Sequence, residues 1–142
     1  MKYVVMVIAQ LMLGMSLNAQ TGHINIKITE IVAEWGGAVT VGLFNKEGFP
    51  KSGEAVVTRN LPVRGIQITT SFRDIPVGDY AIAVYQDVNS DHKLNRTIYG
   101  QPTEPYGFSQ NSFGRFGPPK FEAVAFSVSS NQDLDLKITL KE

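Results

Sequence analysis

The chain has 142 residues, enough for one domain, and carries 13 basic and 13 acidic side chains. Because the formal net charge is zero, the chain lacks the positive surface of a nucleic-acid binder, and we expect no nucleic-acid partner. The content of 43% hydrophobic and 18% charged residues is typical of a globular protein and not of a disordered one. The absence of cysteine excludes disulfides, thiol catalysis and cysteine-based zinc sites.

Residues 1–19 have the three-part form of a secretory signal peptide. Lys2 gives the short positive end, an apolar stretch follows, and Ala19 stands at the expected cleavage position. The apolar stretch is about 15 residues long, whereas a membrane-spanning helix needs roughly 20. We therefore expect cleavage after Ala19, a secreted or periplasmic location, and a mature chain of residues 20–142 that forms a single domain without a membrane span.

Alternation of apolar and polar residues with a period of two predicts strands along most of the mature chain. No stretch shows the sustained 3.6-residue period of an amphipathic helix. The predicted strands are 22–29, 38–44, 55–58, 66–72, 80–85, 121–129 and 134–140. About seven short strands separated by turn residues predict an all-β fold, a single antiparallel β-sandwich of the immunoglobulin or prealbumin type. A small β-barrel is the alternative all-β form.

One long segment, residues 87–119, lacks strand periodicity. Loops beyond about 12–15 residues are usually either functional or disordered. This segment contains several aromatic residues together with four glycines and four prolines, a composition that favours an ordered loop folded back onto the sandwich. Two interpretations stay open: a lid that only covers one end of the core, and a lid that carries a binding site.

The loop begins with the D-x-N-x-D spacing of a calcium loop. Alternate residues of a turning loop can direct several oxygens at one Ca²⁺, which prefers about six to eight oxygen ligands. The predicted ligands of this weak site are Asp87, Asn89, Asp91, the backbone carbonyl of Lys93, and Asn95. His92 stands where such a loop has glycine, and Ile98 stands where it has the closing glutamate. The alternative is a cluster of Asx turns, in which these side chains bond to their own backbone without a metal.

A second set of residues is predicted to form a ligand surface: Trp35, Glu104, Tyr106, Phe108 and Arg115. Trp35 stands beside Gly36-Gly37 in a turn, as an exposed ring for sugar stacking or as a plug over the end of the sandwich. Glu104 with Asp87 or Asp91 is a candidate carboxylate pair of the glycosidase kind. Tyr80 follows a Pro-x-Gly turn at a strand start, which predicts a structural tyrosine corner.

Several stretches resemble one bacterial family. Residues 72–87 read FRDIPVGDYAIAVYQD, with a phenylalanine, a Pro-x-Gly turn, Tyr-Ala and a final Asp, and residues 89–95, 100–109 and 116–123 continue the pattern. On these residues the chain resembles the DUF2141 family of small secreted bacterial proteins over nearly all of residues 22–141. Family members typically have glycine within the Asp-Asn loop and an acid at its end, where this chain has Ser90, His92 and Asn95. The resemblance implies secretion and a β-sandwich, and it implies no established activity.

These observations predict a non-catalytic binding or accessory module rather than an enzyme. Its expected partner is an envelope protein or glycan, and its only expected cofactor is Ca²⁺. One alternative is an envelope carbohydrate-active enzyme that uses Glu104 and a loop aspartate. Another is a structural partner subunit of an envelope assembly, docked through an edge strand or an apolar patch.

Overall fold

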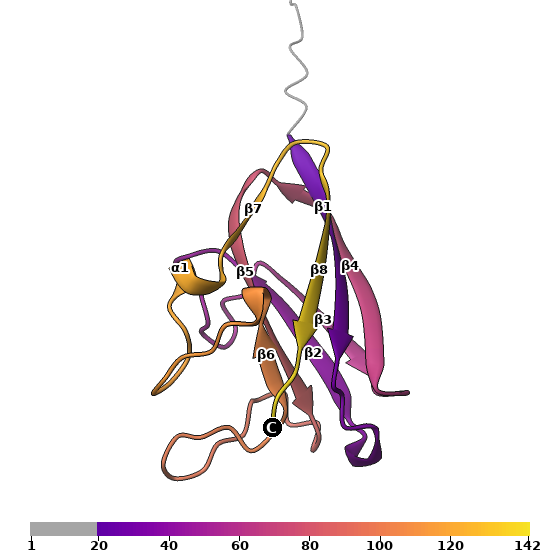
Figure 1. Ribbon diagram of the computed structural model, residues 1–142, viewed down its shortest axis with the longest axis vertical. Coiled ribbons are helices and arrows are strands. Elements are labelled where there is room, and N and C mark those ends of the chain that lie inside the picture. Colours follow the sequence, from indigo (N-terminus) through magenta and orange to yellow (C-terminus); the bar gives the residue numbers. More distant parts are fainter. Residues whose placement is uncertain (1–19) are drawn as a thin grey trace, which may run out of the picture.

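The computed structural model describes residues 20–142, so the predicted signal peptide lies outside the described residues. The fold is all-β and has two sheets (Figure 1). One sheet has the strand order β4-β1-β8, and the other has the order β3-β2-β5-β6 with β7 also paired to β5. The strands are β1 (Thr21–Thr29), β2 (Ala38–Phe44), β3 (Val57–Pro62), β4 (Gln67–Pro76), β5 (Gly78–Asp87), β6 (Tyr106–Phe108), β7 (Phe126–Val128) and β8 (Asp133–Thr139). Three short helical turns join them: η1 (Ala33–Trp35), η2 (Ser109–Asn111) and α1 (Phe121–Val124). No helix within residues 20–142 is long and apolar enough to cross a membrane.

The main core lies between the two sheets, where the alternating residues of their strands meet. The apolar phase of β1 and that of β2 are both at most 1% exposed, which confirms the alternation read from the sequence: Ile24, Ile26, Ile28, Val39, Val41 and Leu43. Residues of β4, β5, β7 and β8 complete the same cluster. Burial of these side chains stabilises the fold by roughly 1.5–3 kcal/mol for each large one.

The sandwich is not wholly antiparallel, because β1 and β8 pair in parallel. The reason lies in the turn that precedes β8: Asn131 donates its backbone N–H to the Thr21 carbonyl, and His23 donates to the Gln132 carbonyl. This turn places the start of β8 beside the start of β1, so both strands run in the same direction (Figure 1). The assignment of the sandwich to the immunoglobulin or prealbumin type stays a prediction.

Three segments differ from the predicted elements. The strand predicted at 55–58 begins two residues later and runs to Pro62, as β3. The predicted strand 121–129 is a helical turn, α1, followed by the short strand β7. Val124 is fully buried in a second apolar cluster, so tertiary packing there overrides the extended form. Within the predicted loop 87–119, Tyr106–Phe108 forms the strand β6, which pairs with β5. Three residues are too short for alternation to identify a strand.

Tyr80 forms the predicted corner at the start of β5. Its ring is 8% exposed and lies in the main core, and its hydroxyl donates a hydrogen bond of 2.8 Å to the Pro76 carbonyl. The corner therefore fixes the sharp reversal between β4 and β5, which the structure makes with Val77 alone between the strands.

Replacement of Tyr80 by phenylalanine should destabilise the fold without changing it. The Tyr80→Phe variant loses one partly buried hydrogen bond, and we expect the free energy of unfolding in urea to fall by about 0.5–1.5 kcal/mol. The control is Tyr99→Phe, since Tyr99 is 86% exposed. Equal unfolding midpoints for the two variants would show that the hydroxyl of Tyr80 contributes nothing to the corner.

Candidate functional site

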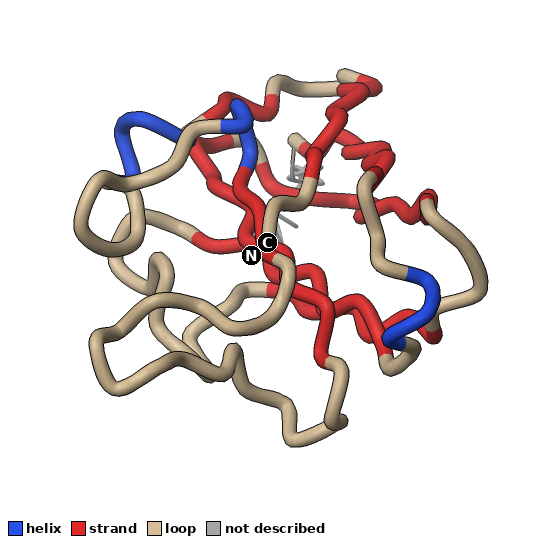
Figure 2. The backbone as a smooth tube through the Cα atoms, turned by 60° about the horizontal axis from the view of Figure 1, so that its bottom comes forward, coloured by secondary structure: helices blue, strands red, loops and turns tan. Residues whose placement is uncertain are grey.

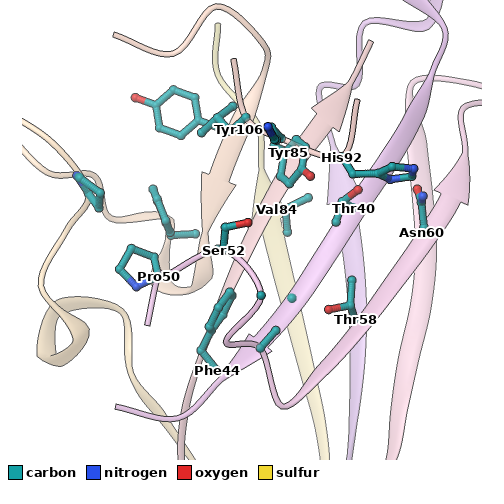
Figure 3. Close-up of a pocket in the computed structure, with 18 of the residues that line it drawn as sticks. Thr40, Phe44, Pro50, Ser52, Thr58, Asn60, Val84, Tyr85, His92 and Tyr106 are labelled. Carbon is teal, nitrogen blue, oxygen red and sulfur yellow. The ribbon is translucent and has the colours of Figure 1, made fainter. Parts of the chain in front are cut away.

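The outer face of the larger sheet carries the candidate site. Because side chains alternate along strands, the residues that face away from the core line up across neighbouring strands. The pairing registers give two such rows, Asn60-Thr40-Tyr85-Tyr106 and Thr58-Gly42-Ala83-Phe108. Figure 3 shows Tyr85, Thr40 and Asn60 on adjacent strands of this outer face, which is the floor of the candidate site. In the middle of the second row, Gly42 and Ala83 have little side-chain volume, and the ring of Phe44 packs over Gly42.

Three loop segments raise walls around this floor and enclose a cavity of about 600 Å³. The first segment follows β2 and contributes Pro50 and Ser52, which Figure 3 shows opposite the floor residues. The second follows β5 and contributes His92, Lys93, Leu94 and Arg96, and the third contributes Pro118. A second cavity of about 470 Å³ adjoins the first. The two share lining residues Arg96, Tyr106, Phe108 and Pro118, and the second adds Tyr99, Arg115, Phe116 and Lys141 among others.

Edge-to-face aromatic contacts hold these walls against the sheet. Phe49 contacts Phe44, Phe108 and Phe121 at centroid distances of 5.8–6.0 Å. Tyr106, Phe108 and Phe113 form a second group, with centroids 5.5–6.1 Å apart. Such pairs add about 0.5–1.5 kcal/mol each beyond their buried area. The loops that enclose the cavities are therefore packed onto the sheet, as the sequence predicts for the 87–119 segment.

Two buried carboxylates organise the segment after β5. Asp87 is 1% exposed, and its two oxygens accept the backbone N–H groups of Asp91 at 3.2 Å and His92 at 2.8 Å. Glu104 is 6% exposed, and its oxygens accept the N–H groups of Val88 at 2.9 Å and Asn95 at 3.0 Å. Charge-assisted bonds of this kind are about twice as strong as neutral ones. Together they satisfy backbone donors that have no strand partner.

Asp91 forms a second, more exposed cluster with Asn89 and Asn95. The Asn95 amide donates to Asp91 Oδ2 at 2.8 Å, and this bond is the main cause that holds the pKa of Asp91 below its ordinary value. The backbone N–H of Lys93 donates to Asp91 Oδ1 at 2.9 Å and acts in the same direction. Close by, burial raises the pKa of Tyr85, and the charges of Asp87, Glu104 and Asp91 raise it further.

The predicted calcium ligands thus lie in one loop, but their hydrogen bonds are those of the Asx-turn alternative. Asp91 accepts backbone donors within the loop, and Asn89 Oδ1 accepts the Asp91 N–H at 3.3 Å. Asn95 Oδ1 is buried and has no hydrogen-bond partner among the described residues. Within residues 20–142, no group of three or more His, Asp or Glu side chains is arranged to hold a metal ion.

The predicted ligand surface is only partly brought together. Tyr106 and Phe108 line both cavities, and Arg115 lines the second. Glu104 is buried beneath the loop, where it accepts backbone N–H groups. Trp35 is 44% exposed in η1 and lines neither cavity.

No local pattern in the sequence identifies the floor of the main cavity. Its members Thr40, Thr58, Asn60 and Tyr85 come from three strands, and their proximity depends on registers that the sequence does not state. The outward phase of 38–44 contains Gly42, and a glycine within a strand indicates the close approach of another group, which here is the Phe44 ring. The structural role of Gln86 is likewise not evident from the sequence. It is fully buried, and its amide bonds to Val32 and Gly36, which fixes η1 to the end of β5.

The Glu104→Gln variant should loosen the segment after β5. An amide nitrogen cannot accept a hydrogen bond, so the N–H of Val88 or Asn95 loses its partner, at a cost of about 1–3 kcal/mol. We expect these two amides to exchange faster with deuterium and the protein to unfold at lower urea. The control is Glu122→Gln, which breaks an exposed ion pair with Lys46 and should leave stability almost unchanged, because exposed ion pairs contribute little. Unchanged exchange at both amides would contradict the anchoring role of Glu104.

Comparisons with known proteins agree with the resemblance seen in the sequence. No curated protein and no solved structure matches the chain. A family model described as "Uncharacterized protein conserved in bacteria (DUF2141)" matches residues 17–136. Because this match spans most of the chain, the protein belongs to the DUF2141 family.

Proposed function

We propose that this protein is a secreted or periplasmic, non-catalytic binding module of the immunoglobulin or prealbumin type. Its ligand site is the cavity of about 600 Å³ on the outer face of the larger sheet. This cavity is the single observation that carries the proposal, since ligand pockets usually measure about 300–1,000 Å³. The partner is a small molecule or a protruding group of an envelope protein or glycan that fits this space.

The lining of the cavity supports a binding role. Phe44, Leu94, Tyr106, Phe108 and Pro118 supply apolar surface, whereas an outer sheet face is ordinarily polar and open to solvent. Hydroxyl and amide groups lie among them, from Thr40, Thr58, Asn60 and Ser52. A mostly apolar wall with a few polar groups is the usual composition of a site that binds and orients an organic ligand.

The roles of the two buried acids favour binding over catalysis. A glycosidase needs one carboxyl group to protonate the leaving oxygen and another to act as base or nucleophile. Here Glu104 and Asp87 each accept two backbone N–H groups, and neither lines the cavity. Their contacts account for their burial in structural terms.

A tryptophan placed on the cavity floor should block binding. Thr58 is exposed and points from β3 into the cavity, so Thr58→Trp would fill the space without altering the core. The probe is phenylnaphthylamine, a neutral aromatic dye that fluoresces in apolar sites. We expect saturable binding to the wild type and at least about tenfold weaker binding to Thr58→Trp. The control is Thr69→Trp on the outer face of the other sheet. Equal affinities for the two variants, or no binding to the wild type, would refute the proposal.

A calcium site in the 87–95 loop is a second candidate function. The observation that favours it is Asn95 Oδ1, a buried oxygen without a hydrogen-bond partner that belongs to the same side chain as the donor to Asp91. Asp91 itself is exposed and keeps its charge to a lower pH than usual, because the Asn95 amide lowers its pKa. An oxygen of each residue, with loop carbonyls, would form a weak site of the extracellular type.

Calcium should then stabilise the protein in a manner that depends on Asp91. With a Kd of about 1 mM, 10 mM Ca²⁺ would add about 1.4 kcal/mol to the free energy of unfolding. We expect the melting temperature of the wild type to rise in Ca²⁺ and that of Asp91→Asn to stay constant. Asp133→Asn, at the start of β8, is the matched control. No shift up to 10 mM Ca²⁺, with no heat in calorimetric titration, would exclude the site.

A further inference from the structure

We infer that the ligand of the main cavity is an organic anion, with an apolar body on the aromatic floor and its anionic group at Lys93 and Arg96. This inference rests on the proposed binding function and specifies the class of ligand. Three features carry it: the charge of the residues around the cavity, the availability of the two cationic side chains, and the apolar surface beside them.

The charged side chains that line the two cavities are basic, in a chain whose total charge is zero. Residues 87–120 contain four cationic side chains and three acids. Two of these acids, Asp87 and Glu104, are buried, and each accepts two backbone N–H groups. No acidic residue lines either cavity, whereas Lys93 and Arg96 line the first and Arg96, Arg115 and Lys141 line the second. A cleft lined by charge of one sign concentrates ligands of the opposite sign.

Lys93 and Arg96 are available to a ligand. Neither forms an ion pair within residues 20–142, where the pairs found are Lys46 with Glu122 and His92 with Asp87. Arg96 Nη1 donates to the Gly100 carbonyl at 2.9 Å, which positions the guanidinium group and leaves its other N–H donors for a ligand. The backbone at Lys93 is held by Asp91, so both cations project from an ordered loop.

Lys141, which lines the second cavity, is differently placed. Lys141 Nζ lies 4.0 Å from the ring centre of Phe113 and 5.5 Å from that of Tyr106. These cation–π contacts hold Lys141 against the pair Tyr106 and Phe113, of which Tyr106 lines both cavities. Arg96 therefore lies where both cavities meet, next to rings that can pack against the body of the ligand.

Three carboxylates lie near the floor of the cavity. Asp87, Asp91 and Glu104 raise the pKa of Tyr85, so their field reaches one side of the cavity. Hydrogen bonds from N–H groups stabilise the charged form of each, and the charge of Lys93 helps to lower the pKa of the exposed Asp91. The anionic group is accordingly assigned to the side of Lys93 and Arg96, and the apolar body to the side of Phe108 and Tyr106.

The test compares two dyes that differ by one charge. Anilinonaphthalene sulfonate has the aromatic body of phenylnaphthylamine plus a sulfonate group. We expect the sulfonate dye to bind the wild type at least about tenfold more tightly at low salt, and to lose that advantage in 0.5 M salt, where the Debye length is about 4 Å. The variant Lys93→Gln with Arg96→Gln should weaken the sulfonate dye by about tenfold or more and change the neutral dye by less than about twofold.

The control variant removes the same two charges elsewhere, as Lys27→Gln with Arg64→Gln, neither of which lines the main cavity. Circular dichroism verifies that each variant is folded, and displacement of both dyes by the Thr58→Trp substitution verifies the site. If the neutral dye binds in the cavity and the sulfonate dye binds no better, or is equally weakened in the control, the anion assignment is wrong and the binding function stands. If neither dye binds the wild type, the proposed function fails as well.

Discussion

The candidate site depends on how the backbone after β5 satisfies its hydrogen bonds. A segment that is not in a sheet must find partners for its N–H groups, or it costs free energy wherever water is excluded. Here Asp87 and Glu104, at the two ends of the segment, accept four of these groups with their carboxylate oxygens. The aromatic contacts around Phe108 and Phe113 then press the following chain onto the sheet. These four bonds fix the wall that His92, Lys93 and Arg96 contribute to the cavity.

The cavity itself arises from a departure from ordinary sheet design. An exposed sheet face usually presents a continuous layer of polar side chains. In this protein, Gly42 and Ala83 stand side by side in that layer, the ring of Phe44 packs over Gly42, and loops on three sides rise above the sheet. Figure 2, in which the bottom of Figure 1 comes forward, shows how much of this end of the molecule consists of loops and turns. The inner faces of the same strands pack in the main core, so the cavity on the outer face does not reduce the packing of the core.

The sequence predicts the strands well because burial on one face imposes a two-residue period, as in Ile24, Ile26 and Ile28. It also identifies the 87–119 segment and its acids, since long ordered loops and the D-x-N-x-D spacing are local features. The floor of the cavity was out of reach, because Thr40 and Tyr85 become neighbours only through strand register. The role of Glu104 could not be predicted for the same reason. Its hydrogen bonds to the N–H groups of Val88 and Asn95 form only because the folded loop brings its two ends together.

The parallel pairing of β1 with β8 determines when the protein can fold during its synthesis. The central strand of the smaller sheet receives one of its two neighbours from a segment synthesised more than a hundred residues later. A growing polypeptide therefore cannot close the sandwich until β8 has left the ribosome, and contacts so distant in sequence slow the folding of any chain.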